Sequence, residues 1–260
     1  MATLRDQLPR PPAPQAPPRL LGEDYRFSPD RLPSTRPFRV EHEAVHLLER
    51  PLALERVYHV RDLADVQLVV GFRLCWNGSA DAVESLFQFV ESFQREIPIE
   101  AVRRISDEGI GEFGLAWSWD DPFGAEIVAL VRANVLVTVQ GQDTAGLPER
   151  VAAEVDGELR ALRTMEAYPE VAGGAFEPIR EKAARGPVEI PAGGRITLGS
   201  QPRGERWFFL TTRGSANRDP GAPDTWYYRA GLDRGPAEVR LFRVDPGLVP
   251  VLERLTLEIR

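Results

Sequence analysis

Apolar residues in the middle of the chain form two kinds of pattern, continuous runs and a helical period, and each predicts one kind of element. The run "VQLVVGFRLCW" (66–76) is continuously apolar and rich in β-branched residues, so it predicts a buried strand. Apolar residues then recur every three or four positions through residues 79–97, which predicts a helix that ends before Pro98. The same spacing over residues 147–162 predicts a second helix.

Three further strands are expected between these helices. "GLAWSWDD" (114–121) predicts one, and "EIVALVRANVLVTVQG" (126–141) predicts two strands joined at Ala133-Asn134, since asparagine tolerates the positive φ of a tight hairpin. The order strand, helix, three strands, helix predicts an α+β domain over residues 37–166, arranged as a two-layer α/β sandwich.

The pattern changes on either side of this domain. Residues 1–36 are proline-rich and hold few large apolar residues, which predicts a disordered arm. Residues 167–187 are punctuated by glycine and proline and predict a linker. Short alternating runs separated by turn residues fill residues 188–260, which predicts a small all-β, sandwich-like domain.

Composition narrows the possible partners and the location. The net charge is −7, and basic residues are scattered among acidic ones, which argues against nucleic acid as a partner. No apolar run reaches the roughly 18 residues that a membrane span needs. The N-terminus lacks the apolar core of a signal peptide, so a cytoplasmic location is expected, or the cell envelope if a leader is missing. Lys182 is the only lysine, a bias we interpret as that of a GC-rich bacterial genome.

One motif points to a metal. His42-Glu43-Ala44-Val45-His46 fits HExxH, the zinc-binding helix signature of metalloproteases. On a helix, the two imidazoles would lie about 6 Å apart and share one zinc ion, while Glu43 would act as the general base. On a strand, the same four positions would span about 13 Å and chelation would fail. The apolar spacing fits a helix and a strand equally well.

The surroundings of the motif weaken the zinc hypothesis. Glu49 and Leu52 stand where one protease class has glycine and a third histidine. His59, the remaining histidine, lies beyond Pro51 and reaches His42 and His46 only through a tight chain reversal. Zinc is therefore an alternative here, and otherwise no cofactor is expected.

Aromatic residues of the C-terminal domain form a second group of candidates. Trp207, Trp226 and Tyr228 lie in two short predicted strands. Exposed on a sandwich, such a row would stack on sugar rings and make a carbohydrate-binding module. The other interpretation is that these side chains pack in the core of the domain.

Residues 109–159 resemble a pattern found in uncharacterised bacterial cell-envelope proteins. The run begins with "GIGEFGLAWSWDD", continues with a hairpin of the form "VRxNVxVxV" and ends with an amphipathic helix. The resemblance implies an α+β fold and a possible envelope location, and it carries no catalytic residues.

These observations together predict a non-enzymatic bacterial protein with a role in binding or assembly. The partner would be another protein that contacts the proline-rich arm or the β-domain. Two alternatives stay open. One is a zinc metallopeptidase that uses the HEAVH motif, and the other is a carbohydrate-binding module on residues 188–260.

Overall fold

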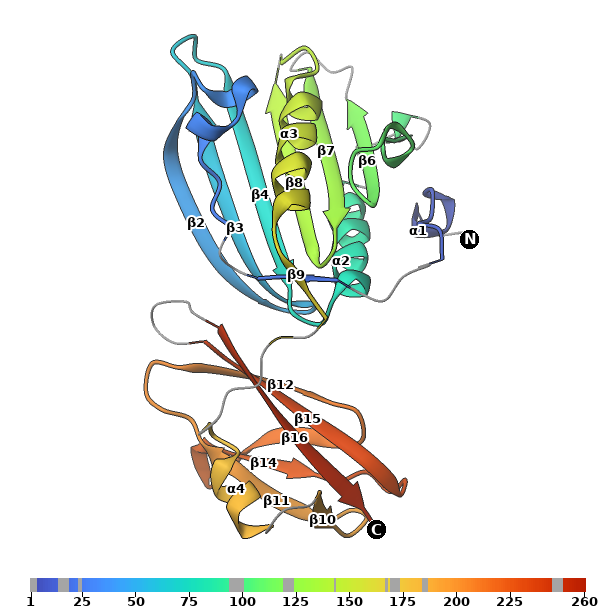
Figure 1. The fold of residues 1–260 in the computed structure, drawn as a ribbon, viewed down its shortest axis with the longest axis vertical. Helices are drawn as coiled ribbons and strands as arrows, with labels where there is room; N and C mark the ends of the chain where they lie inside the picture. The colour runs from blue at the N-terminus through green and yellow to red at the C-terminus, as the bar shows by residue number, and fades with distance from the viewer. Residues whose placement is uncertain are drawn as a thin grey trace. The chain divides into compact units, whose positions relative to one another are not determined.

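The structure is a computed structural model, and it divides into two compact units, residues 1–167 and 168–260. Figure 1 shows both units as ribbons, coloured along the chain. The residues that it describes are 4–13, 19–22, 25–93, 101–118, 124–142, 144–166, 168, 174–183, 187–244 and 250–260. Within these residues no helix combines the length and the apolar character needed to cross a membrane.

A seven-stranded sheet forms the first unit, in the order β2-β3-β4-β8-β7-β6-β5. All neighbouring strands in it are antiparallel. The strand bounds are Arg39–Glu49 (β2), Leu52–Arg61 (β3), Gln67–Cys75 (β4), Arg103–Arg104 (β5), Phe113–Ser118 (β6), Ala125–Arg132 (β7) and Val135–Gln142 (β8).

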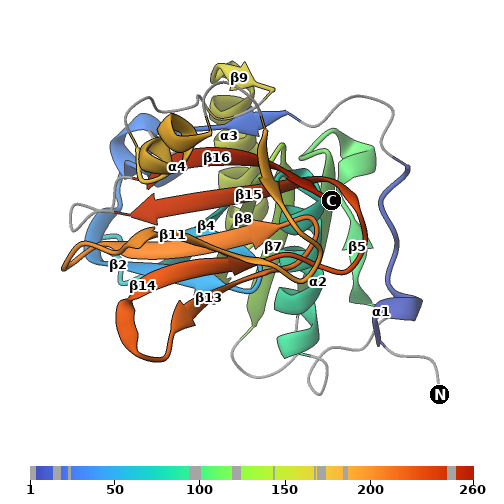
Figure 2. The same cartoon turned by 90° about the horizontal axis from the view of Figure 1, so that it is seen from below.

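Two helices pack on this sheet, one on each face (Figures 1 and 2). Helix α2 (Ser79–Ser92) buries Leu86 and Val90 in one apolar cluster with residues of β6, β7 and β8. Helix α3 (Leu147–Ala161) packs against β7 and β8. The unit is therefore a mixed α+β fold that is mostly β, and its sheet is covered on both faces rather than on one as the sequence predicts.

The central elements lie where the hydrophobic pattern places them. Strands β4, β6, β7 and β8 and helices α2 and α3 correspond to the predicted segments. Helix α2 ends at Ser92, and residues 94–100, the rest of the predicted helix, lie outside the described residues. The predicted hairpin forms at Ala133-Asn134, but the positive φ, 52°, belongs to Ala133. Asn134 is instead fully buried, and its side chain forms hydrogen bonds with the backbone of Leu21 and Cys75.

The N-terminal residues differ from the expected disordered arm. Leu21, Phe27 and Leu32 are buried in the first unit. A short strand β1 (Leu20–Leu21) pairs with β9 (Thr164–Met165), and a helical turn α1 (Leu4–Gln7) and two 3₁₀ turns (Pro29–Arg31 and Pro33–Thr35) complete the described part. The prolines do not prevent docking, because a fixed φ lowers the conformational entropy lost when the segment becomes ordered.

Two sheets face each other in the second unit. One has the order β10-β16-β15-β12 and the other β11-β14-β13. The strand bounds are Val188–Ile190 (β10), Arg195–Ser200 (β11), Arg206–Thr211 (β12), Ser215–Asp219 (β13), Ala222–Arg229 (β14), Gly235–Val244 (β15) and Pro250–Ile259 (β16). The expected linker contains helix α4 (Glu177–Lys182), and Phe176 before it is fully buried in the core of this unit. Part of the expected linker is therefore ordered, because Phe176 anchors it in the core of this unit.

Candidate functional site

A cleft on the first unit gathers arginine side chains from distant parts of the sequence. Its volume is about 560 Å³, and its walls come from the N-terminal segment, the loop before β6, the β7–β8 hairpin, the end of α3 and β9. We call it the arginine cleft, and it is lined by Arg19, Leu21, Gly109, Gly111, Glu112, Arg132, Ala133, Leu159, Arg160 and Thr164.

A buried ion pair forms one wall of this cleft. Arg132 donates two hydrogen bonds to Asp156 of α3, from Nε to Oδ1 at 2.7 Å and from Nη2 to Oδ2 at 2.8 Å. Asp156 also accepts a hydrogen bond from the backbone N–H of Gly111 at 3.1 Å. Because Asp156 is only 1% exposed, this network fixes the loop, the hairpin and the helix relative to one another.

Electrostatics at Asp156 follow from these contacts. Burial disfavours the charged carboxylate, but the hydrogen bonds from Arg132 and from the Gly111 N–H outweigh it and hold the pKa of Asp156 below its ordinary value. Asp156 is therefore ionised at neutral pH and keeps the Arg132 guanidinium in a fixed orientation beside the cleft.

Two other arginines of the cleft remain open to solvent. Arg160 donates to Asp156 Oδ2 at 2.6 Å and to the carbonyl of Gly109, yet half of its side chain, 52%, is exposed. Arg19 is exposed, and among the described residues it makes no ion pair. With Glu112 and Asp156 as the carboxylates, three arginines face two acids, so the cleft is locally cationic on a chain whose net charge is −7.

The hairpin that carries Arg132 also anchors the N-terminal segment. Asn134 Oδ1 accepts a hydrogen bond from the Leu21 N–H at 2.5 Å, and Asn134 Nδ2 donates to the Leu21 carbonyl at 3.3 Å. The same Nδ2 donates to the Cys75 carbonyl at 2.9 Å. The side chain thus imitates a strand partner for Leu21 and places Arg19, two residues earlier, at the rim of the cleft.

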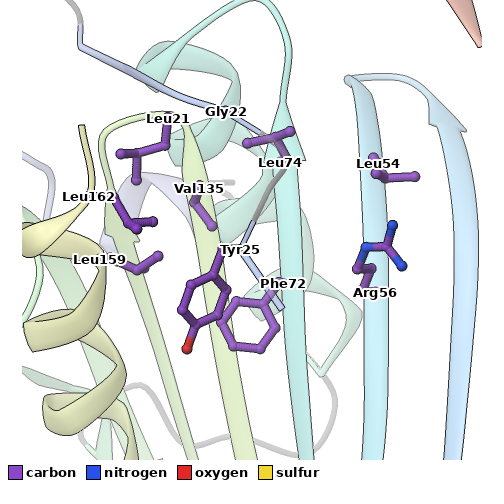
Figure 3. Close-up of a pocket in the computed structure, with 10 residues that line it drawn as sticks. All are labelled: Leu21, Gly22, Tyr25, Leu54, Arg56, Phe72, Leu74, Val135, Leu159 and Leu162. Atoms are coloured by element: carbon purple, nitrogen blue, oxygen red, sulfur yellow. The ribbon is translucent and has the colours of Figure 1, made fainter. Parts of the chain in front are cut away.

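A small apolar cavity lies next to the arginine cleft, and Leu21 and Leu159 line both spaces. Figure 3 shows its lining, in which Tyr25 lies against Phe72, with ring centroids 5.0 Å apart. Its volume of about 30 Å³ is enough for one or two waters and too small for an organic ligand. Tyr25 lines the cavity and donates a hydrogen bond to Glu158 at 2.7 Å, and burial raises the pKa of this tyrosine.

The HEAVH motif lies on a strand. His42, Glu43 and His46 belong to β2, so the helix that a metallopeptidase requires is not formed, and four strand positions, a backbone span of about 13 Å, separate the two histidines. His59 of β3 lies directly opposite His42, with ring centroids 5.8 Å apart. Glu43 forms an ion pair with Arg56 at 3.1 Å. Among the described residues, no three His, Cys, Asp or Glu side chains are placed to hold a metal.

The aromatic candidates of the second unit do not form an exposed row. Trp207 is 5% exposed and Tyr228 fully buried, and both lie in the core cluster of the unit. Trp226 is half-buried against Phe209, with ring centroids 4.8 Å apart, while Arg218 lies over its ring and its Nε1 donates a hydrogen bond to Gln201 at 3.0 Å. The structure therefore favours the core-packing interpretation of Trp207 and Tyr228 over a sugar-stacking platform.

Comparisons with known proteins add no further information. No family model matches the chain, and searches of curated proteins and of solved structures found no significant match. The arginine cleft was not predicted from the sequence. The sequence feature that comes nearest to it is the run of residues 109–159 that resembles cell-envelope proteins. This run contains four residues of the site, Gly109, Gly111, Arg132 and Asp156.

Proposed function

We propose that the chain is a binding protein whose first unit binds an anionic ligand in the arginine cleft. The observation that carries this proposal is the convergence of Arg19, Arg132 and Arg160 on one space of about 560 Å³. Guanidinium groups bind carboxylate and phosphate groups through paired, charge-assisted hydrogen bonds. A role in binding is also what the sequence predicts, and in the structure the HEAVH motif lies on a strand while Trp207 and Tyr228 lie in a core.

The shape of the cleft indicates the size and character of the ligand. Small-molecule sites have volumes of roughly 300–1,000 Å³, combine apolar walls with a few polar groups and are largely pre-formed. Leu21, Ala133 and Leu159 provide apolar wall here, and the Arg132–Asp156 pair pre-orders one cationic group. The ligand that fits best therefore joins a carboxylate or phosphate to a short apolar part.

Isothermal titration calorimetry tests this proposal with hexyl phosphate and hexanoate as probes. We expect both to bind the full chain, and we expect hexyltrimethylammonium, a cation with the same apolar part, not to bind. The double variant Arg19→Ala/Arg160→Ala should weaken binding at least about tenfold, because two charge-assisted contacts are lost. Higher salt should also weaken binding, since both side chains are open to solvent.

Arg150→Ala is the matched control. Arg150 is an exposed arginine of α3, the helix that also carries Arg160, and it does not line the cleft. It should bind both probes as the parent chain does. The proposal is refuted if neither anionic probe binds, if the cation binds equally well, or if the double variant retains the parent affinity.

A further inference from the structure

Strand β2 is an edge of the seven-stranded sheet, and no other described strand pairs with its outer side. Its partner among the described strands is β3 (Figure 1). Strand β2 is eleven residues long, whereas β5 at the opposite edge has two residues. The backbone N–H and C=O groups along an edge strand can pair with a further strand. Edge strands of this length are usually shielded, so the side chains of β2 decide which strand fits beside it.

All three histidines lie on the same face of this edge. Side chains alternate along a strand, and no bulge interrupts the pairing between His42 and Glu49, so His42 and His46 share a face. His59 is opposite His42 on that face, while Glu55 is opposite His46. His42, His46 and His59 are all exposed. In one copy of the chain, the imidazoles of His42 and His59 are therefore adjacent, and that of His46 lies four residues farther along β2.

The charges of β2 restrict how it pairs with β2 of a second copy. Two β2 strands that pair antiparallel are related by a two-fold axis, and the residue at that axis names the register. A pair about Glu43 places the Glu43 carboxylates of the two copies opposite each other. A pair about His42 places Glu41 of one copy opposite Glu43 of the other. A pair about Val45 sets Glu41 against Glu49. Like charges directly opposite each other destabilise a sheet. Each of these registers is therefore disfavoured.

A pair about Ala44 avoids these conflicts. It sets Glu43 opposite Val45 and brings the Arg39 end of each strand beside the Glu49 end of the other, where opposite charges attract. The same register sets His42 opposite the second copy's His46. Three imidazoles then lie in a row on three neighbouring strands, which are about 4.8 Å apart.

We propose that two copies of the chain pair through their β2 edges about Ala44 and that each of two equivalent sites binds a zinc ion. His42 and His59 of one copy and His46 of the other are the ligands at each site. Imidazole nitrogens are preferred zinc ligands, and three protein ligands leave a fourth position for water. Among the described residues of one copy, no third ligand joins His42 and His59, so in this proposal the site is complete only in the dimer.

Sedimentation equilibrium of the full chain tests this proposal. After treatment with EDTA the chain should be monomeric, and zinc should convert it to a dimer that contains one zinc ion per chain. His42→Ala, His46→Ala and His59→Ala should each abolish the zinc-dependent dimer. Gln67→Ala, a change at an exposed residue of β4 in the same sheet, should dimerise as the parent chain does.

The sharpest test mixes two variants that are each expected not to form the zinc-dependent dimer. His46→Ala chains retain His42 and His59, and His42→Ala chains retain His46, so a mixture rebuilds one of the two sites. We expect a zinc-dependent heterodimer in the mixture and monomers in each variant alone. The proposal is overturned if the parent chain stays monomeric with zinc, if His46→Ala dimerises or binds zinc as the parent does, or if the mixture stays monomeric.

Discussion

The side chain of Asn134 holds the backbone of Leu21 through two hydrogen bonds across 113 positions of the sequence. It donates a further hydrogen bond to the Cys75 carbonyl. One buried amide therefore connects the β7–β8 hairpin, the end of β4 and the N-terminal segment, and it positions the segment that carries Arg19 at the cleft.

Asn134→Ala should destabilise the first unit by about 2–3 kcal/mol, because buried backbone groups of Leu21 and Cys75 lose their partners. Urea unfolding measures this change, and hydrogen exchange at the Leu21 amide should become faster. Asn134→Asp keeps the acceptor for the Leu21 N–H and should protect that amide better than alanine does. Equal exchange at Leu21 in the parent chain and in Asn134→Ala would show that the contact is unimportant.

The Arg132–Asp156 pair predicts a loss of stability in acid. The pKa of Asp156 is lowered in the folded state, because hydrogen bonds from Arg132 and Gly111 outweigh the effect of burial. Folding then favours the ionised form, so its contribution is complete above the unfolded pKa of about 4 and is lost as the pH falls through the folded pKa. Asp156→Asn should cost about 3 kcal/mol at pH 7, where Arg132 loses its charged partner.

Urea unfolding at pH 7, 4 and 3 separates these effects. The parent chain should lose more stability than Asp156→Asn does between pH 4 and pH 3. Asp107→Asn, a change at an exposed carboxylate whose side chain is 72% accessible, should retain the pH dependence of the parent. An Asp156→Asn variant that loses as much stability in acid as the parent would contradict this account of the pair.

Removal of residues 1–36 should destabilise the first unit. The shortened chain, residues 37–260, lacks Leu21, Phe27 and Leu32, and each buried apolar side chain of this size contributes about 1.5–3 kcal/mol. Thermal unfolding followed by circular dichroism should show a lower midpoint or no cooperative transition for that unit. A chain that begins at residue 4 serves as the control. An unchanged midpoint for residues 37–260 would restore the disordered-arm hypothesis.

Two glycine substitutions should have opposite effects. A Cβ atom at Gly174 would lie 2.1 Å from Oε2 of Glu253, a fully buried side chain that pairs with Arg243 at 2.7 Å. Gly174→Ala should therefore destabilise the second unit by about 1–3 kcal/mol. A Cβ atom at Gly157, inside α3, meets nothing within 4 Å, so Gly157→Ala should stabilise the first unit by about 0.5–1 kcal/mol. Chemical unfolding of both variants measures the contrast, and two changes of the same sign would contradict it.

The sequence predicted the elements whose hydrophobic pattern is clear. Helices α2 and α3 repeat apolar residues every three or four positions, strands β4, β7 and β8 are largely apolar runs, and all lie where these patterns place them. Strand β2 was ambiguous, because it is an edge strand with mostly exposed side chains, so burial imposes no strong period on it. The arm was misjudged, since composition hides the few leucines and phenylalanines that dock.

The candidate site was harder to predict than the fold. Its arginines stand at positions 19, 132 and 160, and the pairing of β1 with β9 and the hydrogen bonds of Asn134 bring them together. Pattern analysis identifies neighbours one or two turns apart, and it does not reveal contacts between such distant segments. From the sequence, His59 was a candidate partner of His42 that requires a tight chain reversal, and the β2–β3 hairpin provides this reversal by placing the two residues opposite each other.

The central claim, that the arginine cleft binds an anion, is tested most directly by mapping backbone amide chemical shifts during a titration with hexyl phosphate. We expect the shifts that change to cluster at the described amides of the cleft, above all at Gly109, Gly111, Ala133 and Thr164. They should saturate together with one dissociation constant. Changes centred on the second unit or on β2, or no saturable change at all, would contradict the claim.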